Sequence, residues 1–160
     1  MIETELKFLP KDDGWRSQAT RHVRIRQGYF AKADGYNVRV RILDGMSAKL
    51  TIKSKKLASG ISRYEFEYPI PLEDAETMMV EFCGGRVVEK VRHYVDYAGH
   101  CWEVDEFFGA NEGLVVAEIE LDSADVKFEK PVWAGEDVTA DSRYGNQRLA
   151  DTPYCEWKRK

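Results

Sequence analysis

The chain has 160 residues and a formal net charge of −4, with 43% hydrophobic and 32% charged residues. These values predict one folded domain spanning residues 1–160, and they exclude a disordered chain and a general basic surface for nucleic acid or anionic membranes. No apolar run approaches the roughly 20 residues of a membrane-spanning helix, and the first residues do not resemble a signal peptide, so we expect a cytoplasmic location.

Apolar and polar residues alternate along most of the chain, as in β-strands with one buried face. In chain order, the alternation predicts strands at residues 2–8, 22–30, 36–43, 47–54, 62–70, 86–97, 100–107 and 115–121. Turn signals such as Asp34-Gly35, Asp44-Gly45 and Ala98-Gly99 separate them. Connections this short favour antiparallel pairing.

Helical patterns are fewer. Residues 71–82 carry apolar side chains at helical spacing, and Pro71 suits the first position of a helix. We also expect a short helix at residues 123–128. From Asp141 onward, the chain should be irregular or weakly helical.

Cysteines and histidines are few and scattered: Cys83, Cys101, Cys155, His22, His93 and His100. None has the paired spacing of a zinc site, and three separated cysteines do not make a disulfide framework. We therefore expect free thiols and no thiol or imidazole chemistry. The spacing leaves open that the histidines meet in the fold.

The first strand places its charges on one face. Because side chains alternate along a strand, Glu3, Glu5 and Lys7 point one way and the residues between them the other. Two carboxylates about 7 Å apart repel each other unless a cation lies near them. This face could hold a divalent cation beside an anion, although the solvated charges of an edge strand would give the same pattern.

The same alternation recurs on most other strands, and several whole strands present only acids or only bases. Strands of opposite sign could pair on a solvated surface. Alternatively, eight strands with apolar outer faces suit a closed barrel with a polar lumen and helices around it. In such a lumen, the bases would hold a polyanion and the acids a divalent metal.

These residues resemble a known family. Glu3-Thr4-Glu5-Leu6-Lys7 is similar to the Glu-x-Glu-x-Lys signature of the CYTH superfamily, the triphosphate tunnel metalloenzymes. Further similar motifs are Gln27-Gly28-Tyr29-Phe30, Val38-Arg39-Val40-Arg41, Leu50-Thr51-Ile52-Lys53, Ser62-Arg63-Tyr64-Glu65-Phe66-Glu67, Val88-Glu89-Lys90-Val91-Arg92, Trp102-Glu103-Val104-Asp105, Ala117-Glu118-Ile119-Glu120 and Asp141-Ser142-Arg143-Tyr144-Gly145-Asn146. The resemblance covers nearly the whole chain and is closest to short, single-domain bacterial members of the inorganic tripolyphosphatase type.

The resemblance implies a mainly β (α+β) protein: a closed eight-stranded antiparallel β-barrel that forms a tunnel, with a few flanking helices. It also implies a hydrolase that releases phosphate from triphosphates, above all inorganic tripolyphosphate, with Mg²⁺ or Mn²⁺ as cofactor. Phosphoryl transfer needs mainly positioning and charge neutralisation, which arginine, lysine and metal ions supply. The number of ions and the general base stay open.

The resemblance also implies roles for the charged residues, some of which have more than one. Those expected to bind phosphates are Lys7, Arg39, Arg41, Lys53, Arg63, Lys90, Arg92 and Arg143. Those expected to bind metal are Glu3, Glu5, Glu118 and Glu120. Those expected to act on the reacting atoms are Glu5, Glu65 and Lys7, while Glu67, Glu103 and Asp105 match further acidic tunnel positions.

Some residues receive a plainer interpretation. We expect Lys49 near the tunnel rim, and Lys55 and Lys56 in a solvated turn. Tyr29 either closes a tunnel mouth or packs in the core. The tryptophans are expected to pack.

Other functions stay open. Class IV adenylyl cyclases and thiamine triphosphatases belong to the same superfamily, but those cyclases carry a His-Phe pair before the signature, where this chain has Met1-Ile2. A polyphosphate-binding or nucleotide-binding module without chemistry would keep the bases and lose the acids, and both sets are present here. We expect a small triphosphate as partner, no nucleic acid and no membrane, and leave open whether the chain forms a homodimer.

Overall fold

The computed structural model describes residues 2–157; Met1 and residues 158–160, the ends of the predicted domain, lie outside the described residues. The strands in this range are β1 (Ile2–Pro10), β2 (Arg21–Tyr29), β3 (Tyr36–Leu43), β4 (Ser47–Ser54), β5 (Ser62–Ile70), β6 (Val87–Tyr97), β7 (His100–Phe107), β8 (Val115–Leu121) and β9 (Ala134–Asp137). The first eight agree with the predicted strands to within two residues at either end.

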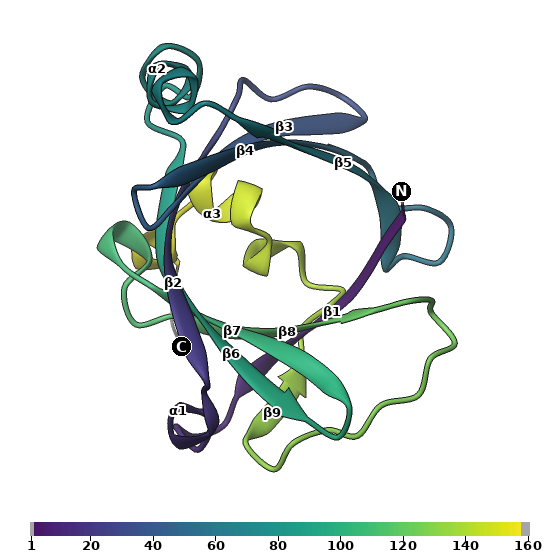
Figure 1. Ribbon diagram of the computed structural model, residues 1–160. Coiled ribbons are helices and arrows are strands. Elements are labelled where there is room, and N and C mark those ends of the chain that lie inside the picture. The colour runs from purple at the N-terminus through teal and green to yellow at the C-terminus, as the bar shows by residue number, and fades with distance from the viewer. Residues whose placement is uncertain (1, 158–160) are drawn as a thin grey trace.

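The sheet closes on itself. The strand order is β5-β4-β3-β2-β6-β7-β8-β1, all antiparallel, and β1 also pairs with β5, which joins the two edges (Figure 1). This seam is short, with three residue pairs between residues 2–4 and 62–64. β9 pairs with the C-terminal end of β1, outside the ring. The predicted closed eight-stranded barrel is confirmed.

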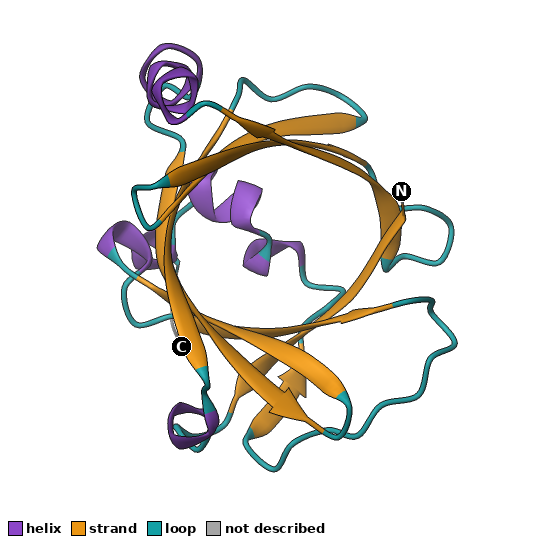
Figure 2. Ribbon diagram, in the orientation of Figure 1, coloured by secondary structure: helices purple, strands orange, loops and turns teal. Residues whose placement is uncertain are grey.

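Helices are few and short (Figure 2). The predicted helix is α2 (Leu72–Phe82), whereas α1 (Trp15–Gln18) and β9 were not predicted, because four residues are too few to show a period. The C-terminal segment contains α3 (Asn146–Asp151) between the 3₁₀ turns Ser142–Tyr144 and Tyr154–Glu156, as its weak helical pattern suggested. A further 3₁₀ turn, Gly109–Asn111, precedes β8. Within residues 2–157, no helix is both long enough and apolar enough to cross a membrane.

The prediction of a helix at residues 123–128 was wrong. The segment consists of turns and extended chain, and Val126 and Phe128 pack against the outside of the barrel. The ring of Phe128 lies 5.9 Å from that of Trp102 and 6.2 Å from that of Phe8. Apolar contacts with the barrel wall therefore override the local helical tendency.

The hydrophobic core lies outside the barrel wall. One cluster packs on the outer face of β1, β7 and β8, around Trp15, Trp102 and Trp133. A second cluster lies between β3, β4 and α2, and a third between β6, β7 and the C-terminal segment. Because each strand buries its apolar side chains outward, the side chains that point inward can be polar.

Gly28 on β2 allows α2 to approach the wall closely. A Cβ atom here would lie 2.6 Å from the Sγ atom of Cys83 and from the Sδ atom of Met79. The expectation that helices surround the barrel is nevertheless only partly met. On the outer face of β5, Tyr64 and Phe66 are 46% and 45% exposed, because α2 covers only the neighbouring strands.

Candidate active site

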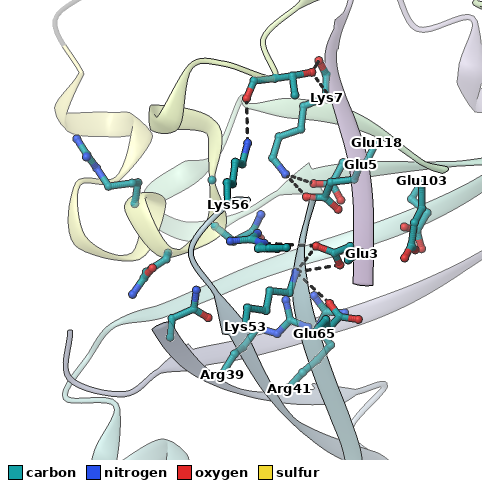
Figure 3. Close-up of a pocket in the computed structure, with 18 of the residues that line it drawn as sticks. Glu3, Glu5, Lys7, Arg39, Arg41, Lys53, Lys56, Glu65, Glu103 and Glu118 are labelled. Atoms are coloured by element: carbon teal, nitrogen blue, oxygen red, sulfur yellow. Dashed lines mark hydrogen bonds and ion pairs between the residues drawn. The ribbon is translucent and has the colours of Figure 1, made fainter. Parts of the chain in front are cut away.

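The barrel encloses a cavity of about 640 Å³. Side chains from β1 to β8 line it, together with residues between Thr139 and Arg148, and this C-terminal segment lies across the ring of strands in Figure 1. Figure 3 shows acidic and basic side chains pointing toward one another across the cavity. The charged faces of the strands therefore form the inside of a tunnel, so the solvated-surface alternative is wrong.

Most predicted site residues meet in this tunnel: Glu3, Glu5, Lys7, Arg39, Arg41, Lys53, Arg63, Glu65, Glu67, Lys90, Arg92, Glu103, Glu118 and Glu120. Strand register explains the gathering, because alternate residues of each strand share one face. Antiparallel pairing then sets opposite charges side by side, as with Lys7 and Glu118 or Lys53 and Glu65.

Lys7 joins two of the predicted metal ligands. Its Nζ atom donates to Glu5 Oε1 at 2.6 Å and to Glu118 Oε2 at 2.7 Å. Burial alone would lower the pKa of Lys7, but the two carboxylates raise it well above its usual value. Burial also opposes ionisation of Glu118, yet the charges of Lys7 and Arg92 hold its pKa well below its usual range. Lys7 and Glu118 are therefore both charged at neutral pH.

Glu3 is the centre of a second group of ion pairs. Lys53 Nζ donates to both of its carboxylate oxygens, at 3.0 and 3.1 Å, and Arg63 Nε lies 3.5 Å from Oε1. Lys53 also lies 3.2 Å from Glu65. Burial opposes ionisation of Glu65, but hydrogen bonding and the charge of Lys53 outweigh it and lower its pKa. Glu65 is therefore ionised at neutral pH.

Asp105 is buried, does not itself line the cavity, and forms ion pairs with two bases. It accepts from Lys90 Nζ at 2.7 Å and from Arg92 Nε and Nη2 at 2.8 and 2.9 Å. Burial would raise the pKa of Asp105, but the charges of Arg92 and Lys90 lower it. Burial lowers the pKa of Lys90 to about 7, because Asp105 offsets only part of the lost hydration while Arg92 and Arg41 repel its charge.

Arg39 and Arg41 form a part of the wall where positive charge is incompletely neutralised. Arg41 Nε donates to Gln27 Oε1 at 2.8 Å, and within residues 2–157 no carboxylate forms an ion pair with Arg41. Burial and the charge of Arg39 lower the pKa of Arg41 to about 10. Arg39 lies 3.5 Å from Glu67, but its buried Nε has no hydrogen-bond partner in the described part of the chain. An anion between the two guanidinium groups would satisfy both.

Glu120 is an acidic residue of the tunnel whose side chain has no basic partner in the described part of the chain. It lies directly opposite Glu5 in the β1–β8 register, and its side chain has no hydrogen bond or ion pair among the described residues. Partial burial and the charges of Glu3, Glu103, Glu65 and Glu5 raise the pKa of Glu120 to about 7. A cation bound among these carboxylates would remove the repulsion.

The four predicted metal ligands fit a divalent ion by their chemistry, because Mg²⁺ and Mn²⁺ prefer carboxylate oxygens. In the chain from residue 2 to 157, however, no three acidic, cysteine or histidine side chains lie close enough together to hold a metal ion. Bases occupy the carboxylates of Glu3, Glu5 and Glu118 in this structure. Metal binding would therefore require Lys7 and Lys53 to release these carboxylates.

The raised pKa of Glu120 predicts a pH-dependent stability. The value rises from 4.5 to about 7 on folding, so between these pH values the folded protein binds the proton more tightly than the unfolded chain. The contribution of Glu120 to stability therefore falls as the pH rises through this window. In metal-free buffer, Glu120→Gln should stabilise the protein by roughly 1 kcal/mol at pH 8, a value reduced by solvent screening, and by much less at pH 4.

Urea unfolding of the two proteins at both pH values measures this difference. An equal gain at pH 4 and pH 8 would show that the effect comes from packing and not from the charge of Glu120.

Arg143 is a predicted phosphate ligand that the structure does not place with the others. Its Nη2 atom donates to Asp141 Oδ2 at 2.7 Å, and its guanidinium lies 4.9 Å from the ring centroid of Trp157. The side chain is 54% exposed, and Arg148 from the same segment lines the tunnel. Phosphate binding by Arg143 stays a prediction.

The residues given a plainer interpretation mostly behave as expected. Lys49 lines the tunnel with 44% of its side chain exposed, which agrees with a place at the rim. Tyr29 both packs and lines the tunnel, at 4% exposure. Lys56 is exposed but also lines the cavity, and its Nζ donates to the Thr139 carbonyl at 3.3 Å. Lys56 and Thr139 are distant in sequence, so local sequence does not reveal this contact.

The sequence-based prediction of the site did not include the uncharged polar residues of the tunnel. Asn37 and Asn146 line the tunnel, and Gln27 lies in its wall, fully buried. These residues are uncharged, so they do not appear in a pattern of charges. Gln27 and Asn146 stand in two of the motifs that resemble the family, and the sequence contains no other signal for them.

The histidines take no part in the tunnel. The ring centroids of His22 and His93 lie 5.9 Å apart, and His93 lies 3.2 Å from Glu106, but none of the three lines the cavity. The cysteines are free thiols, as predicted: Cys83, Cys101 and Cys155.

Known proteins share this sequence pattern. A family model for the CYTH domain matches residues 1–153. An inorganic triphosphatase of Acetivibrio thermocellus is 43% identical over 156 residues, covering 98% of this chain and 97% of the relative. An inorganic triphosphatase of Nitrosomonas europaea is 36% identical over 156 residues, covering 94% of this chain and 97% of the relative.

Solved structures share the barrel. The crystal structure of the inorganic triphosphatase NE1496 has a TM-score of 0.65 at 33% identity and covers 92% of this chain and 93% of its own. The PH1012 protein from Pyrococcus horikoshii has a TM-score of 0.61 at 19% identity, covering 77% of this chain and 80% of its own, which is a likeness of fold alone.

Proposed function

The chain belongs to the CYTH domain family, and from that membership we propose that it hydrolyses triphosphates, with inorganic tripolyphosphate as its main substrate. The inorganic triphosphatases at 43% and 36% identity support this reaction, since they match nearly the whole chain. One observation carries the proposal: within the described residues, Arg41 has no carboxylate partner and Glu120 has no cation, and both line one cavity. Such a cavity suits an anion and a cation bound together.

The bases of the tunnel would bind the phosphate oxygens. Arg39 and Arg41 offer guanidinium N–H groups that carboxylates do not occupy, which suits the forked geometry of phosphate. Arg39 is buried in the wall of the cavity, and burial strengthens the interaction of a cation with a bound anion. The remaining proposed phosphate ligands are Lys7, Lys53, Arg63, Lys90 and Arg92.

We further propose that the carboxylates of Glu3, Glu5, Glu118 and Glu120 hold Mg²⁺ or Mn²⁺. When bound, such an ion would neutralise phosphate charge and polarise the bond to be broken. Lys7 Nζ lies 2.6 and 2.7 Å from Glu5 and Glu118, so it is placed to contact a phosphate beside these carboxylates.

Hydrolysis requires a water molecule to attack the terminal phosphorus in line with the bridging oxygen. A new P–O bond forms as the bond to the bridging oxygen breaks, giving phosphate and pyrophosphate, and the proton of the water passes to a base. Glu5 and Glu65 are the proposed acceptors, because both line the tunnel and the charge of Lys53 keeps Glu65 ionised. Lys7 would stabilise negative charge on the phosphates during the reaction.

The net charge of −4 and the enclosed cavity favour a small-molecule partner over nucleic acid or a membrane surface. A single domain over residues 1–160 and a cytoplasmic location stay predictions, and the question of a homodimer stays open.

Phosphate release by the purified protein tests the proposed function. With Mg²⁺ or Mn²⁺ present, we expect release from tripolyphosphate at least about tenfold faster than from ATP or thiamine triphosphate, because the cavity offers few apolar side chains to hold an organic group. Removing the metal with EDTA should reduce the rate by at least about 100-fold.

Other outcomes would point to the alternative functions. Formation of cyclic AMP from ATP would indicate a cyclase. Tight binding of tripolyphosphate without any phosphate release would indicate a binding module.

A further inference from the structure

Two neutral amides, Gln27 and Asn146, connect two of the tunnel cations. Arg41 Nε donates to Gln27 Oε1 at 2.8 Å, and Lys90 Nζ donates to Asn146 Oδ1 at 2.8 Å. Between the amides, Gln27 Nε2 donates to Asn146 Oδ1 at 3.0 Å. This amide bridge links β3, β2, α3 and β6.

Chemistry fixes the orientation of both amides. Guanidinium and ammonium groups are donors only, so Arg41 and Lys90 must each face an amide oxygen. Gln27 then has its NH₂ group left, which donates to Asn146 and, at 3.0 Å, to the Tyr29 hydroxyl. Every bond of the bridge therefore runs from a donor to an acceptor without conflict.

The bridge differs from the other contacts of the tunnel bases. Lys7, Lys53 and Arg92 are held by carboxylates, which position the cation and also neutralise it. Within residues 2–157, the hydrogen bond of Arg41 is to an amide alone, and Lys90 combines the carboxylate of Asp105 with the amide. An amide oxygen orients a cation without cancelling its charge.

We propose that Gln27 and Asn146 are positioning residues that hold Arg41 and Lys90 toward the triphosphate without adding a negative charge beside them. The inference rests on the proposed function and deepens it. Because Asn146 is the first residue of α3, the docking of the C-terminal segment becomes a condition for the correct placement of Lys90.

Burial makes the bridge costly to break. Gln27 is 0% exposed and Lys90 is 1% exposed, so neither can replace a lost partner with bulk water. Deleting an amide would therefore mix a folding defect with any effect on substrate binding. A replacement that keeps the shape and changes only the charge separates the two.

Asn146→Asp is such a replacement. If the amide only stabilises the fold, the variant should be at least as stable as the parent, because it gains an ion pair with Lys90, and its kinetics should not change. The proposal expects an equal or higher melting temperature together with a KM for tripolyphosphate raised at least about tenfold and a smaller change in kcat.

Gln147→Glu is the matched control. It adds the same charge one residue further along α3, on a side chain that lines the tunnel and has no hydrogen bond or ion pair within the described range. Its KM should rise less than that of Asn146→Asp, because no hydrogen bond joins the side chain of Gln147 to Lys90 within the described residues.

Titration of the Lys90 side chain by NMR provides a readout that needs no substrate. The charged groups that face Lys90 are Asp105, Arg92, Arg41 and Glu118. A carboxylate at position 146 would add to the attraction of Asp105, so the pKa of Lys90 should rise in Asn146→Asp and stay near its parent value in Gln147→Glu.

The kinetic and spectroscopic results separate the two levels of inference. An active parent whose KM is unchanged by Asn146→Asp, or is raised equally by Gln147→Glu, overturns the role of the amides. A parent that neither binds nor hydrolyses tripolyphosphate overturns the proposed function, and the role of the amides toward substrate with it.

Discussion

Glu5→Gln should reduce metal-dependent phosphate release by at least about 100-fold while changing stability little. The substitution keeps the shape of the side chain and removes the charge proposed to bind metal. Lys7 retains its bond to Glu118 at 2.7 Å, so no buried charge is left alone. The change also removes the repulsion between Glu5 and Glu120, which face each other across β1 and β8. Initial rates with Mg²⁺ and Mn²⁺, together with thermal melting, measure both effects.

Glu106→Gln is the control for this prediction. Glu106 accepts from Arg16 Nη2 at 2.8 Å but does not line the tunnel, so its loss should leave the rate unchanged. If Glu5→Gln lowered the melting temperature strongly and kept the parent rate, Glu5 would be structural and not part of the metal site.

Asp105→Asn should cost about 3–5 kcal/mol of the free energy of unfolding. The side chains of Lys90 and Asp105 are each 1% exposed, and Arg92 is also buried, so the variant leaves two buried cations without their shared carboxylate. Urea unfolding near neutral pH measures the loss. The loss should be smaller at pH 9, because the pKa of Lys90 is already lowered to about 7 and the amine can shed its proton there.

An exposed ion pair of similar length provides the control. Arg26 Nη2 and Glu76 Oε1 lie 2.6 Å apart, with side chains 37% and 47% exposed. Glu76→Gln should change the free energy of unfolding by less than about 1 kcal/mol, because water solvates both charges. Equal losses in the two variants would mean that burial of the Asp105 pair has no special cost.

The internal ion pairs of the tunnel join proposed metal ligands to proposed phosphate ligands. Each base that holds a proposed metal ligand is itself a proposed phosphate ligand, as in Lys53 with Glu3 and Lys7 with Glu5 and Glu118. A cation and an anion that enter together would replace these pairs without leaving a charge unbalanced. The internal pairs themselves explain how a tunnel rich in buried charge can fold before either ligand arrives.

The sequence by itself determined the strands and their faces. Alternation along one strand is a local property, so it placed Glu3, Glu5 and Lys7 on a common face and located β1 to β8 within two residues. The likeness of the motifs to the CYTH family then supplied the closed barrel, which alternation alone could not distinguish from an open sheet with a solvated face.

Only the tertiary structure decided which charges meet. The closure of β1 on β5 and the return of residues 139–148 across the ring bring together groups that are distant in sequence. In that geometry, Arg143 donates a hydrogen bond to Asp141, and Gln27 donates one to Asn146. Carboxylates surround Glu120. Contacts between segments also overrode the expected helix at residues 123–128. Hydration and charge pairing depend on neighbours in space, and no local pattern of residues encodes them.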